Sequence, residues 1–569
     1  MASSKPGLFA REATGLVREI GFSLGVMIIL CHVIGLGWQR RVFEYSGPRP
    51  LPIDWMPLGL PAMFWAFLVC GIIVLITGYA SGYVAAAMPR SGGGYVTISR
   101  VIHPIVGYMG GWLMYLAEAF SYGLIGVDVM WAISVFYGIA AAPQSLPLDA
   151  ITMFLGGIAI VWVFVILALL GTRMYGRILQ VMFYIPLAIT VLFFAMWIAG
   201  ATNPSLVETG IQDALGAAPQ TFNTIAVNTG MTANPAGFFD AFSYALPGAF
   251  WAYMGWYATT FLAGEVKEAN KKLPMVLLTS GIIIVIVYLA SSSLAAIATL
   301  NVGKFTDAGH QWSFFQSYGW LSNYKDTGLT AAQIAARNAA IPNFVEAWST
   351  GIAAFTARGL GMGVISWLIA IGAVFWLAND IPPFLLVASR TFFAMSFDRM
   401  MPERFAYVSE RWHAPVWALI VTGIFAIPAC MVEAGFPSWA PEYLKFAGVV
   451  ATDIFDALFL TLFCVSCMLL PLERRDIYDR AAVKHSVGFV VLLGFVATLG
   501  GAFCLYIFIQ QSPWIWSLFV TGAKTSDIVS AVNLIGVVLA GLLLYIWFMY
   551  RNSTKGVDMR TLYLSIPPE

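Results

Sequence analysis

The feature that most constrains this chain is a series of long apolar stretches. A helix needs about 20 apolar residues to cross a bilayer. The stretches lack the two-residue alternation that the strands of a membrane barrel would show. The sequence therefore predicts an all-α integral membrane protein of about twelve transmembrane helices, at residues 20–44, 61–88, 104–138, 150–172, 177–200, 238–265, 275–299, 360–388, 414–433, 443–470, 485–510 and 527–550.

Composition identifies lipid as the solvent of much of the surface. Hydrophobic residues make up 60% of the chain and charged residues only 10%, whereas soluble proteins carry roughly 25% charged residues. So few charges cannot cover a water-soluble fold of this size. The net charge of +1 and the lack of a basic block also argue against nucleic acid as a partner.

Lysine and arginine mark the orientation, because they are enriched in the cytoplasmic connections of membrane proteins. Most of them fall in the connections that are cytoplasmic if the N-terminus is inside. We therefore expect a multi-pass protein of the cell (plasma) membrane with both termini in the cytoplasm. The long polar stretches 201–237 and 300–345 are then expected outside, as loops with short helices over the outer mouth.

Two of the predicted helices carry interruptions near their centres. Gly35 and Gly37 interrupt the first span, where each glycine weakens a helix by about 1 kcal/mol relative to alanine. The run 250–256 (FWAYMGW) occupies the centre of the sixth span. Paired breaks in two inverted repeats are typical of solute sites in membrane carriers, whereas glycines alone also permit close helix packing. The predicted binding residues are Ile34, Gly35, Leu36, Gly37, Phe250, Trp251, Ala252, Tyr253, Met254 and Gly255.

Several ionisable residues lie at membrane depth, where such groups are costly unless they are paired or hydrated. His32 stands directly before the first break, and Asp380 precedes two prolines that release backbone carbonyls. We expect His32, Glu118 and Asp380 to couple transport to an ion. The alternative for each is a satisfied hydrogen bond between helices, and Asp128, nearer the outer side, is expected only to anchor that end.

Several segments resemble the amino acid–polyamine–organocation (APC) permease family, in the order of that family's motifs. Residues 78–95 (GYASGYVAAAMPRSGGGY) look like the family's small-residue helix followed by a Pro and a Ser-Gly-Gly turn, and residues 107–112 contain its Gly-Trp pair. Residues 250–255, which lead to 265–267, look like the family's sixth helix. Residues 388–390 and 398–402 are similar to the exit of its eighth helix. The resemblance implies a five-plus-five inverted-repeat transporter fold with broken helices 1 and 6. It also implies secondary transport of amino acids or related amines.

The chain departs from the family pattern at two positions. Tyr257 stands where the sixth-helix motif often has an acid. Pro186 is the closest match to a lysine that some proton-coupled members carry on helix five. These departures leave both a proton and a sodium ion open as the coupling ion.

An outer gate is implied by the residues that follow the first break. Arg41 stands where sodium-coupled neurotransmitter transporter relatives have an arginine that helps to close the outer side. We expect Arg41 to pair with Asp453, or alternatively with Asp456, and Trp256 to belong to the same gate.

The sequence thus predicts a secondary active permease for amino acids or related amines that works by alternating access and is coupled to protons. Its expected partners are a small-molecule substrate, a coupling proton or sodium ion and the bilayer, and no cofactor is expected. A sodium-coupled or exchange-type carrier and a non-transporting sensor or receptor are the alternatives. An enzyme is not expected, because the five histidines show no ligand spacing. The predicted parts are a cytoplasmic N-terminus (1–19), a transport core of ten helices (20–470), helices eleven and twelve (471–550) and a cytoplasmic C-terminus (551–569).

Overall fold

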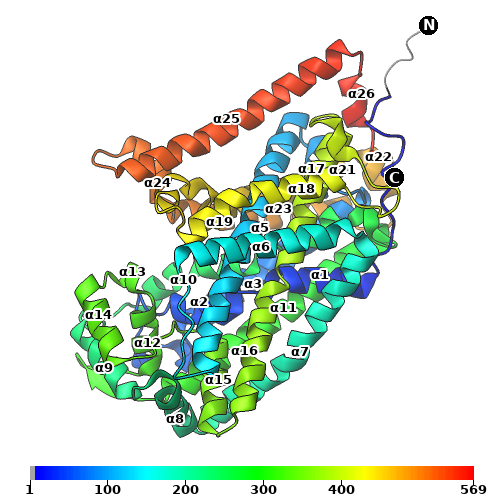
Figure 1. The fold of residues 1–569 in the computed structure, drawn as a ribbon. Coiled ribbons are helices and arrows are strands. Elements are labelled where there is room, and N and C mark those ends of the chain that lie inside the picture. Colours follow the sequence, from blue (N-terminus) through cyan, green and yellow to red (C-terminus); the bar gives the residue numbers. More distant parts are fainter. Residues whose placement is uncertain (1–6, 569) are drawn as a thin grey trace.

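The computed structural model describes residues 7–568 as a helical bundle with both chain termini at one end (Figure 1). We call this the termini end and the opposite one the cap end. Within residues 7–568, eleven helices or interrupted helix pairs are long and apolar enough to cross a membrane. The predicted architecture of many membrane-spanning helices is therefore confirmed.

All twelve predicted spans contain helix. The spans are α1 with α2 (Phe22–Val33 and Gly37–Glu44), α3 (Ala62–Ala87), α5 (Pro104–Ala140), α6 (Ala150–Leu169), α7 (Thr172–Thr202), α10 (Phe238–Tyr253), α11 (Ala269–Leu300), α16 with α17 (Gly363–Ala378 and Ile381–Phe397), α18 with α19 (Val416–Phe425 and Ile427–Ala434), α21 (Val449–Glu473), α23 (Val487–Gln510) and α25 (Thr525–Thr554). Helix α10, in the sixth span, ends after 16 residues. It is too short to cross a bilayer as a regular helix at 1.5 Å per residue.

Small residues let the spans approach one another closely. A Cβ added to Gly82 of α3 would lie 3.0 Å from the Cα of Pro274 on α11. A Cβ added to Gly281 of α11 would lie 2.9 Å from a methyl group of Leu75 on α3. Such close approach, rather than exclusion of water, drives helix association in lipid.

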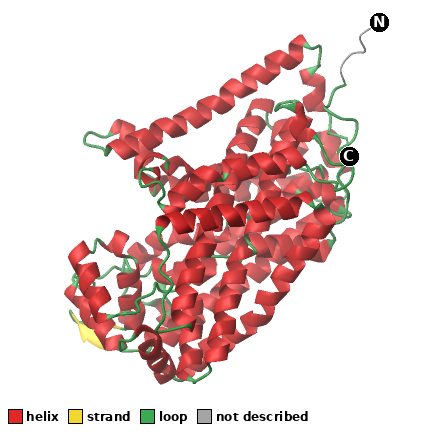
Figure 2. Cartoon of the chain, in the orientation of Figure 1, coloured by secondary structure: helices red, strands yellow, loops and turns green. Residues whose placement is uncertain are grey.

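A cap of short elements covers one end of the bundle. Its helices lie at the left of Figure 1, and Figure 2 shows two short strands in yellow there. The fold is therefore not purely α-helical, because the 300–345 stretch contains an antiparallel hairpin. The cap elements are α8 (Pro204–Leu215), α9 (Pro219–Asn228), β1 (Phe305–Asp307), β2 (His310–Trp312), α12 (Phe314–Ser322), α13 (Tyr324–Thr327) and α14 (Ala331–Ala340), and α15 (Ser349–Gly359), which the sequence did not predict, follows them.

Short elements also tie the termini end together. The N-terminal segment pairs with the chain after the sixth span, since Ile20 N–H donates to the Glu265 carbonyl (3.0 Å) and Lys267 N–H donates to the Ile20 carbonyl (2.8 Å). The elements at this end include α4 (Gly94–Val101), the 3₁₀ turns η3 (Ala258–Phe261), η4 (Ala263–Glu265) and η5 (Glu403–Ala406), α22 (Arg475–Arg480) and α26 (Met559–Leu564). The remaining short elements are η1 (Ile53–Trp55), η2 (Pro57–Gly59), α20 (Ala440–Tyr443), η6 (Lys445–Ala447), α24 (Pro513–Trp516) and η7 (Ser517–Phe519).

Candidate substrate site at the two helix breaks

The first span breaks where the sequence predicts, with residues 34–36 lying between α1 and α2. The side chain of Gln39 stabilises this break. Its amide donates to the carbonyls of Gly35 (2.9 Å) and Ala373 (3.2 Å), and its oxygen accepts from the Thr350 hydroxyl (2.9 Å). Since unpaired backbone groups are costly inside a membrane, Gln39 allows the helix to open at this point.

The sixth span breaks after Tyr253, again as predicted. Gly255 has φ +89°, a left-handed conformation that glycine adopts without steric cost. A Cβ at Gly255 would collide with the imidazole of His32. The glycine thus serves both the turn and the close approach of the two broken helices.

Tyr288 of α11 joins the two breaks, a role that no pattern in the sequence indicates. Its hydroxyl lies 2.5 Å from the carbonyl oxygen of Val33 and 2.6 Å from that of Ala252. A hydroxyl has one proton to donate, so it can donate to only one of the two carbonyls at a time. A polar path therefore runs from one broken helix to the other through Tyr288.

A narrow cavity lies beside these breaks. It touches Leu36 and Gly37 of the first span and Trp251, Ala252 and Met254 of the sixth. Its free volume is about 40 Å³, which is room for about three water molecules. The other walls come from α5, α21 and the α16–α17 junction.

Five carboxylates line this cavity, and each belongs to a residue that is at most 6% exposed: Glu118, Asp128, Asp380, Asp453 and Asp456. Asp380 lies between α16 and α17, directly against the first break. A Cβ added to Gly35 would lie 2.5 Å from its Oδ2 atom. Among the described residues, the Oδ1 atom of Asp380 has no hydrogen-bond partner.

His32 and Glu118 face each other at the same cavity. The Nε2 atom of His32 lies 3.7 Å from a carboxylate oxygen of Glu118 on α5. The imidazole packs on Phe384 of α17, with 4.2 Å between ring centroids. Neither ring nitrogen has a hydrogen-bond partner among the described residues. His32 therefore touches side chains from the third and eighth spans as well as Gly255.

Not every predicted aromatic faces the cavity. Of the three proposed to contact a solute, only Trp251 lines it. Phe250 packs towards α23, with its ring centroid 5.8 Å from that of Phe503. Tyr253 donates to the Phe67 carbonyl of α3 at 3.0 Å. The structure thus does not bring Phe250 and Tyr253 to the cavity, because they point to other sides of α10.

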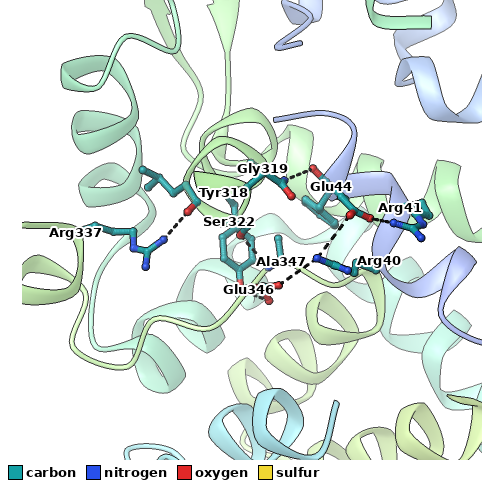
Figure 3. A network of polar contacts seen from close by, with 12 residues as sticks. Arg40, Arg41, Glu44, Tyr318, Gly319, Ser322, Arg337, Glu346 and Ala347 are labelled. Atoms are coloured by element: carbon teal, nitrogen blue, oxygen red, sulfur yellow. Dashed lines mark hydrogen bonds and ion pairs between the residues drawn. The ribbon is translucent and has the colours of Figure 1, made fainter. Parts of the chain in front are cut away.

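At the cap end, charged side chains form a closure around α2 (Figure 3). Arg41 pairs with Glu44, and its guanidinium lies 3.8 Å from the ring centroid of Trp251. Arg40 lies 3.6 Å from Glu44 and 3.8 Å from Glu346, in the loop before α15. We call these four residues, Arg40, Arg41, Glu44 and Glu346, the cap closure.

The gate expected from the sequence differs from this arrangement. Within residues 7–568, Arg41 makes no ion pair with Asp453, and Glu44, one helical turn away, takes that place. Asp456 accepts a short hydrogen bond from Tyr257. Trp256 packs near Gly78 of α3 and does not line the cavity. The pairing of Arg41 with Asp453, which we expect when the cavity is closed to the outside, stays a prediction.

At the termini end, two buried ion pairs form a second closure. Arg390 binds Glu265 through two hydrogen bonds of 2.8 and 3.0 Å. Arg100 binds Asp398 in the same two-pronged way, at 2.6 and 2.8 Å, and Tyr95 also donates to Asp398 at 2.9 Å. We call these two pairs the termini closure. Sequence reasoning missed them, although four of these five residues lie in the motif segments.

With this geometry described, comparison with known proteins is informative. The amino acid permease family matches residues 57–558. The chain belongs to this family. The family is one of membrane transporters rather than enzymes, which fits a closed cavity between two broken helices.

Individual relatives are more distant. The chain is 23% identical over 305 residues to the serine/threonine exchanger SteT of Bacillus subtilis (strain 168), which covers 52% of this chain and 59% of that protein. It is 23% identical over 330 residues to the mouse (Mus musculus) solute carrier family 7 member 12, covering 54% and 61% of the two chains. It is 22% identical over 301 residues to the mouse solute carrier family 7 member 13, covering 50% and 53%. The chain thus matches only about half to three fifths of the length of these relatives.

Proposed function

We propose that this permease is a secondary active transporter of amino acids or related amines that works by alternating access and is coupled to protons. The observation that carries the proposal is the pair of helix breaks beside one cavity that is closed at both ends. A solute enters this cavity when one closure opens and leaves it when the other opens. We place the termini end in the cytoplasm of a plasma-membrane protein, because lysines and arginines are concentrated on that side.

The two ends of an amino acid fit different groups at the breaks. The first N–H groups of a helix have no intrahelical acceptor and carry partial positive charge. At Gly37, where α2 begins beside the cavity, they are suited to a carboxylate. The carbonyls released at Val33 and Ala252, together with Asp380, are suited to an ammonium group.

Three groups are candidates for carrying the coupled proton. Asp380 lies against the first break, and His32 faces Glu118 across 3.7 Å. An imidazole and carboxylates can take up and release protons during a cycle. Their contacts with the first, third, sixth and eighth spans allow proton binding to influence the elements that must move.

Exchange is the second candidate for the transport mode. It is favoured by the relative named as a serine/threonine exchanger. An exchanger needs no ion gradient, whereas a proton symporter accumulates solute when only a pH gradient is imposed. Sodium coupling would appear as accumulation that requires a sodium gradient.

Uptake into proteoliposomes tests the proposal. With no sodium present, a pH gradient that is more acidic outside the vesicles should drive accumulation of the solute inside them. Asp380→Asn should abolish the accumulation, because Asp380 lies against the first break. Asp213→Asn is the matched control, because Asp213 pairs with Arg358 outside the cavity and its side chain is 55% exposed. Full accumulation by Asp380→Asn would remove Asp380 from the coupling mechanism.

A further inference from the structure

The cavity is the one part of the transport path described above whose charges do not balance. The cap closure contains two arginines and two glutamates, and the termini closure pairs each arginine with one acid. The described residues that line the cavity include five carboxylates and neither lysine nor arginine. Positive charge therefore has to come from outside the protein, as protons, ions or solute.

Only part of this negative charge has a partner within the protein. Glu118 faces His32, and Asp456 accepts from Tyr257. Asp380 is 4% exposed, lines the cavity and has an oxygen without a hydrogen-bond partner among the described residues. Since an unpaired carboxylate in a dry site is costly, Asp380 is suited to a cationic group of the solute.

A second carboxylate without a partner lies on a different wall. Asp453 lies one helical turn before Asp456 on α21, a spacing that places both on one face of the helix. In the described part of the chain, no hydrogen bond or ion pair holds the Asp453 side chain, which is 6% exposed. Arg41 is near enough to interact with it electrostatically, but Arg41 is already paired with Glu44.

We infer that the cavity selects solutes with two cationic groups, such as dibasic amino acids and diamines, and that Asp453 binds the second cation. This inference rests on the proposed transport function. When the cavity widens to admit the solute, the first ammonium binds at Asp380 and the break carbonyls, and the second binds at Asp453 on the α21 wall. A neutral amino acid is a zwitterion and brings no net charge to offset the five acids, whereas lysine brings one surplus positive charge and a diamine brings two.

Competition for transport tests this selectivity. Proteoliposomes are assayed for counterflow of labelled lysine and, separately, labelled serine, with unlabelled lysine, 1,4-diaminobutane, leucine and serine as competitors. We expect lysine and 1,4-diaminobutane, which each carry two cationic groups, to inhibit at concentrations at least about tenfold lower than the neutral amino acids. Asp453→Asn should lower this preference about tenfold, which corresponds to one partly buried ion pair. Asp453→Glu should keep the preference, and Asp213→Asn should leave it unchanged.

The possible results separate the inference from the function on which it rests. Transport of serine with no preference for solutes with two cationic groups, or an unaltered preference in Asp453→Asn, would overturn the inference and leave the transporter proposal intact. Counterflow of neither labelled solute would contradict the transporter proposal itself. If Asp453→Asn is poorly folded, lysine-induced thermal stabilisation of Asp453→Glu and the parent protein gives the same comparison. Stabilisation by serine as large as that by lysine in both would also overturn the inference.

Discussion

The two closures of the cavity are built differently. At the termini end, both ion pairs are two-pronged, and their side chains are at most 2% exposed. At the cap end, Arg40 reaches two glutamates at 3.6 and 3.8 Å, and these side chains are 16–28% exposed. Removing one member of a buried pair typically costs 3–5 kcal/mol, whereas an exposed pair contributes only about 0–1 kcal/mol.

This difference indicates which side resists opening in this conformation. The termini closure must separate two buried charge pairs, whereas at the cap closure only the contact of Arg40 with Glu346 joins α2 to another segment. We therefore expect the cavity to open more readily towards the cap.

The largest expected effect comes from the break between the closures. Gly35→Leu places a side chain on the Asp380 carboxylate, with the Cβ alone 2.5 Å from Oδ2. Transport should fall below detection while the protein stays folded, as measured by uptake and thermal unfolding. Gly21→Leu is the control, because a Cβ at Gly21 meets nothing within 4 Å. Normal uptake by Gly35→Leu would mean that the break is not the transport site.

The next effect concerns the termini closure. Glu265→Gln removes the carboxylate charge that the buried Arg390 binds through two hydrogen bonds, and should destabilise this closure by about 3–5 kcal/mol. This opening can be measured with Ser91→Cys as a buried reporter for a thiol reagent added from the termini side. In the Glu265→Gln variant, labelling of this cysteine should rise at least about 100-fold over the protein without that change. Ser91 lies beside this closure and pairs with the backbone at Leu262.

A double variant separates charge loss from general damage. Glu265→Gln with Arg390→Leu removes both charges and should restore much of the protection, since removing one member of a buried ion pair costs more than replacing both. Labelling that stays as high as in the single variant would show that packing at Glu265, rather than the ion pair, keeps this end closed.

A smaller effect is expected at the cap closure. Arg40→Gln removes the link between α2 and Glu346, worth about 0–1 kcal/mol. Labelling of Thr452→Cys, in the cavity wall, from the cap side should rise by about fivefold at most. A rise as large as that produced by Glu265→Gln at the other end would refute the difference between the two closures.

The smallest effect lies at the edge of the cap. Some burial opposes ionisation of Asp54, but its hydrogen bonds with the His310 ring (3.0 Å) and the Gln311 N–H (3.0 Å) hold its pKa below the usual range. An acid with a lowered pKa stabilises the folded state above its unfolded pKa, and this stabilisation is lost as the pH falls through the folded pKa. Asp54→Asn should therefore lower the unfolding temperature by about 1–2 °C at pH 7. The difference should shrink as the pH falls below about 4 and disappear below the lowered pKa of Asp54. A difference that persists in strong acid would exclude this charge effect.

Much of the fold could be predicted from the sequence, because the signals are local. Apolar runs of membrane-spanning length gave the spans, and closely spaced glycines gave the break at Gly35 and Gly37. Asp380 was found because a carboxylate in an apolar run is rare. These signals need no knowledge of which helices are neighbours.

The rest depends on helix rotation and on contacts between distant segments. Successive helical residues point about 100° apart, so Trp251 enters the cavity while Phe250 and Tyr253 point elsewhere. The bridge through Tyr288 requires α11 to pack against both breaks. The pair of Glu265 and Arg390 joins positions 125 residues apart, and no local pattern indicates such a contact.

Counterflow most directly tests the central claim that the cavity between the breaks belongs to an alternating-access carrier. Proteoliposomes are preloaded with unlabelled lysine and diluted into a trace of labelled lysine without any ion gradient. We predict a transient accumulation of label inside the vesicles above its external concentration, because a carrier that releases unlabelled lysine outside returns with labelled lysine. Label that only equilibrates, or does not enter for any amine tested, would contradict the account.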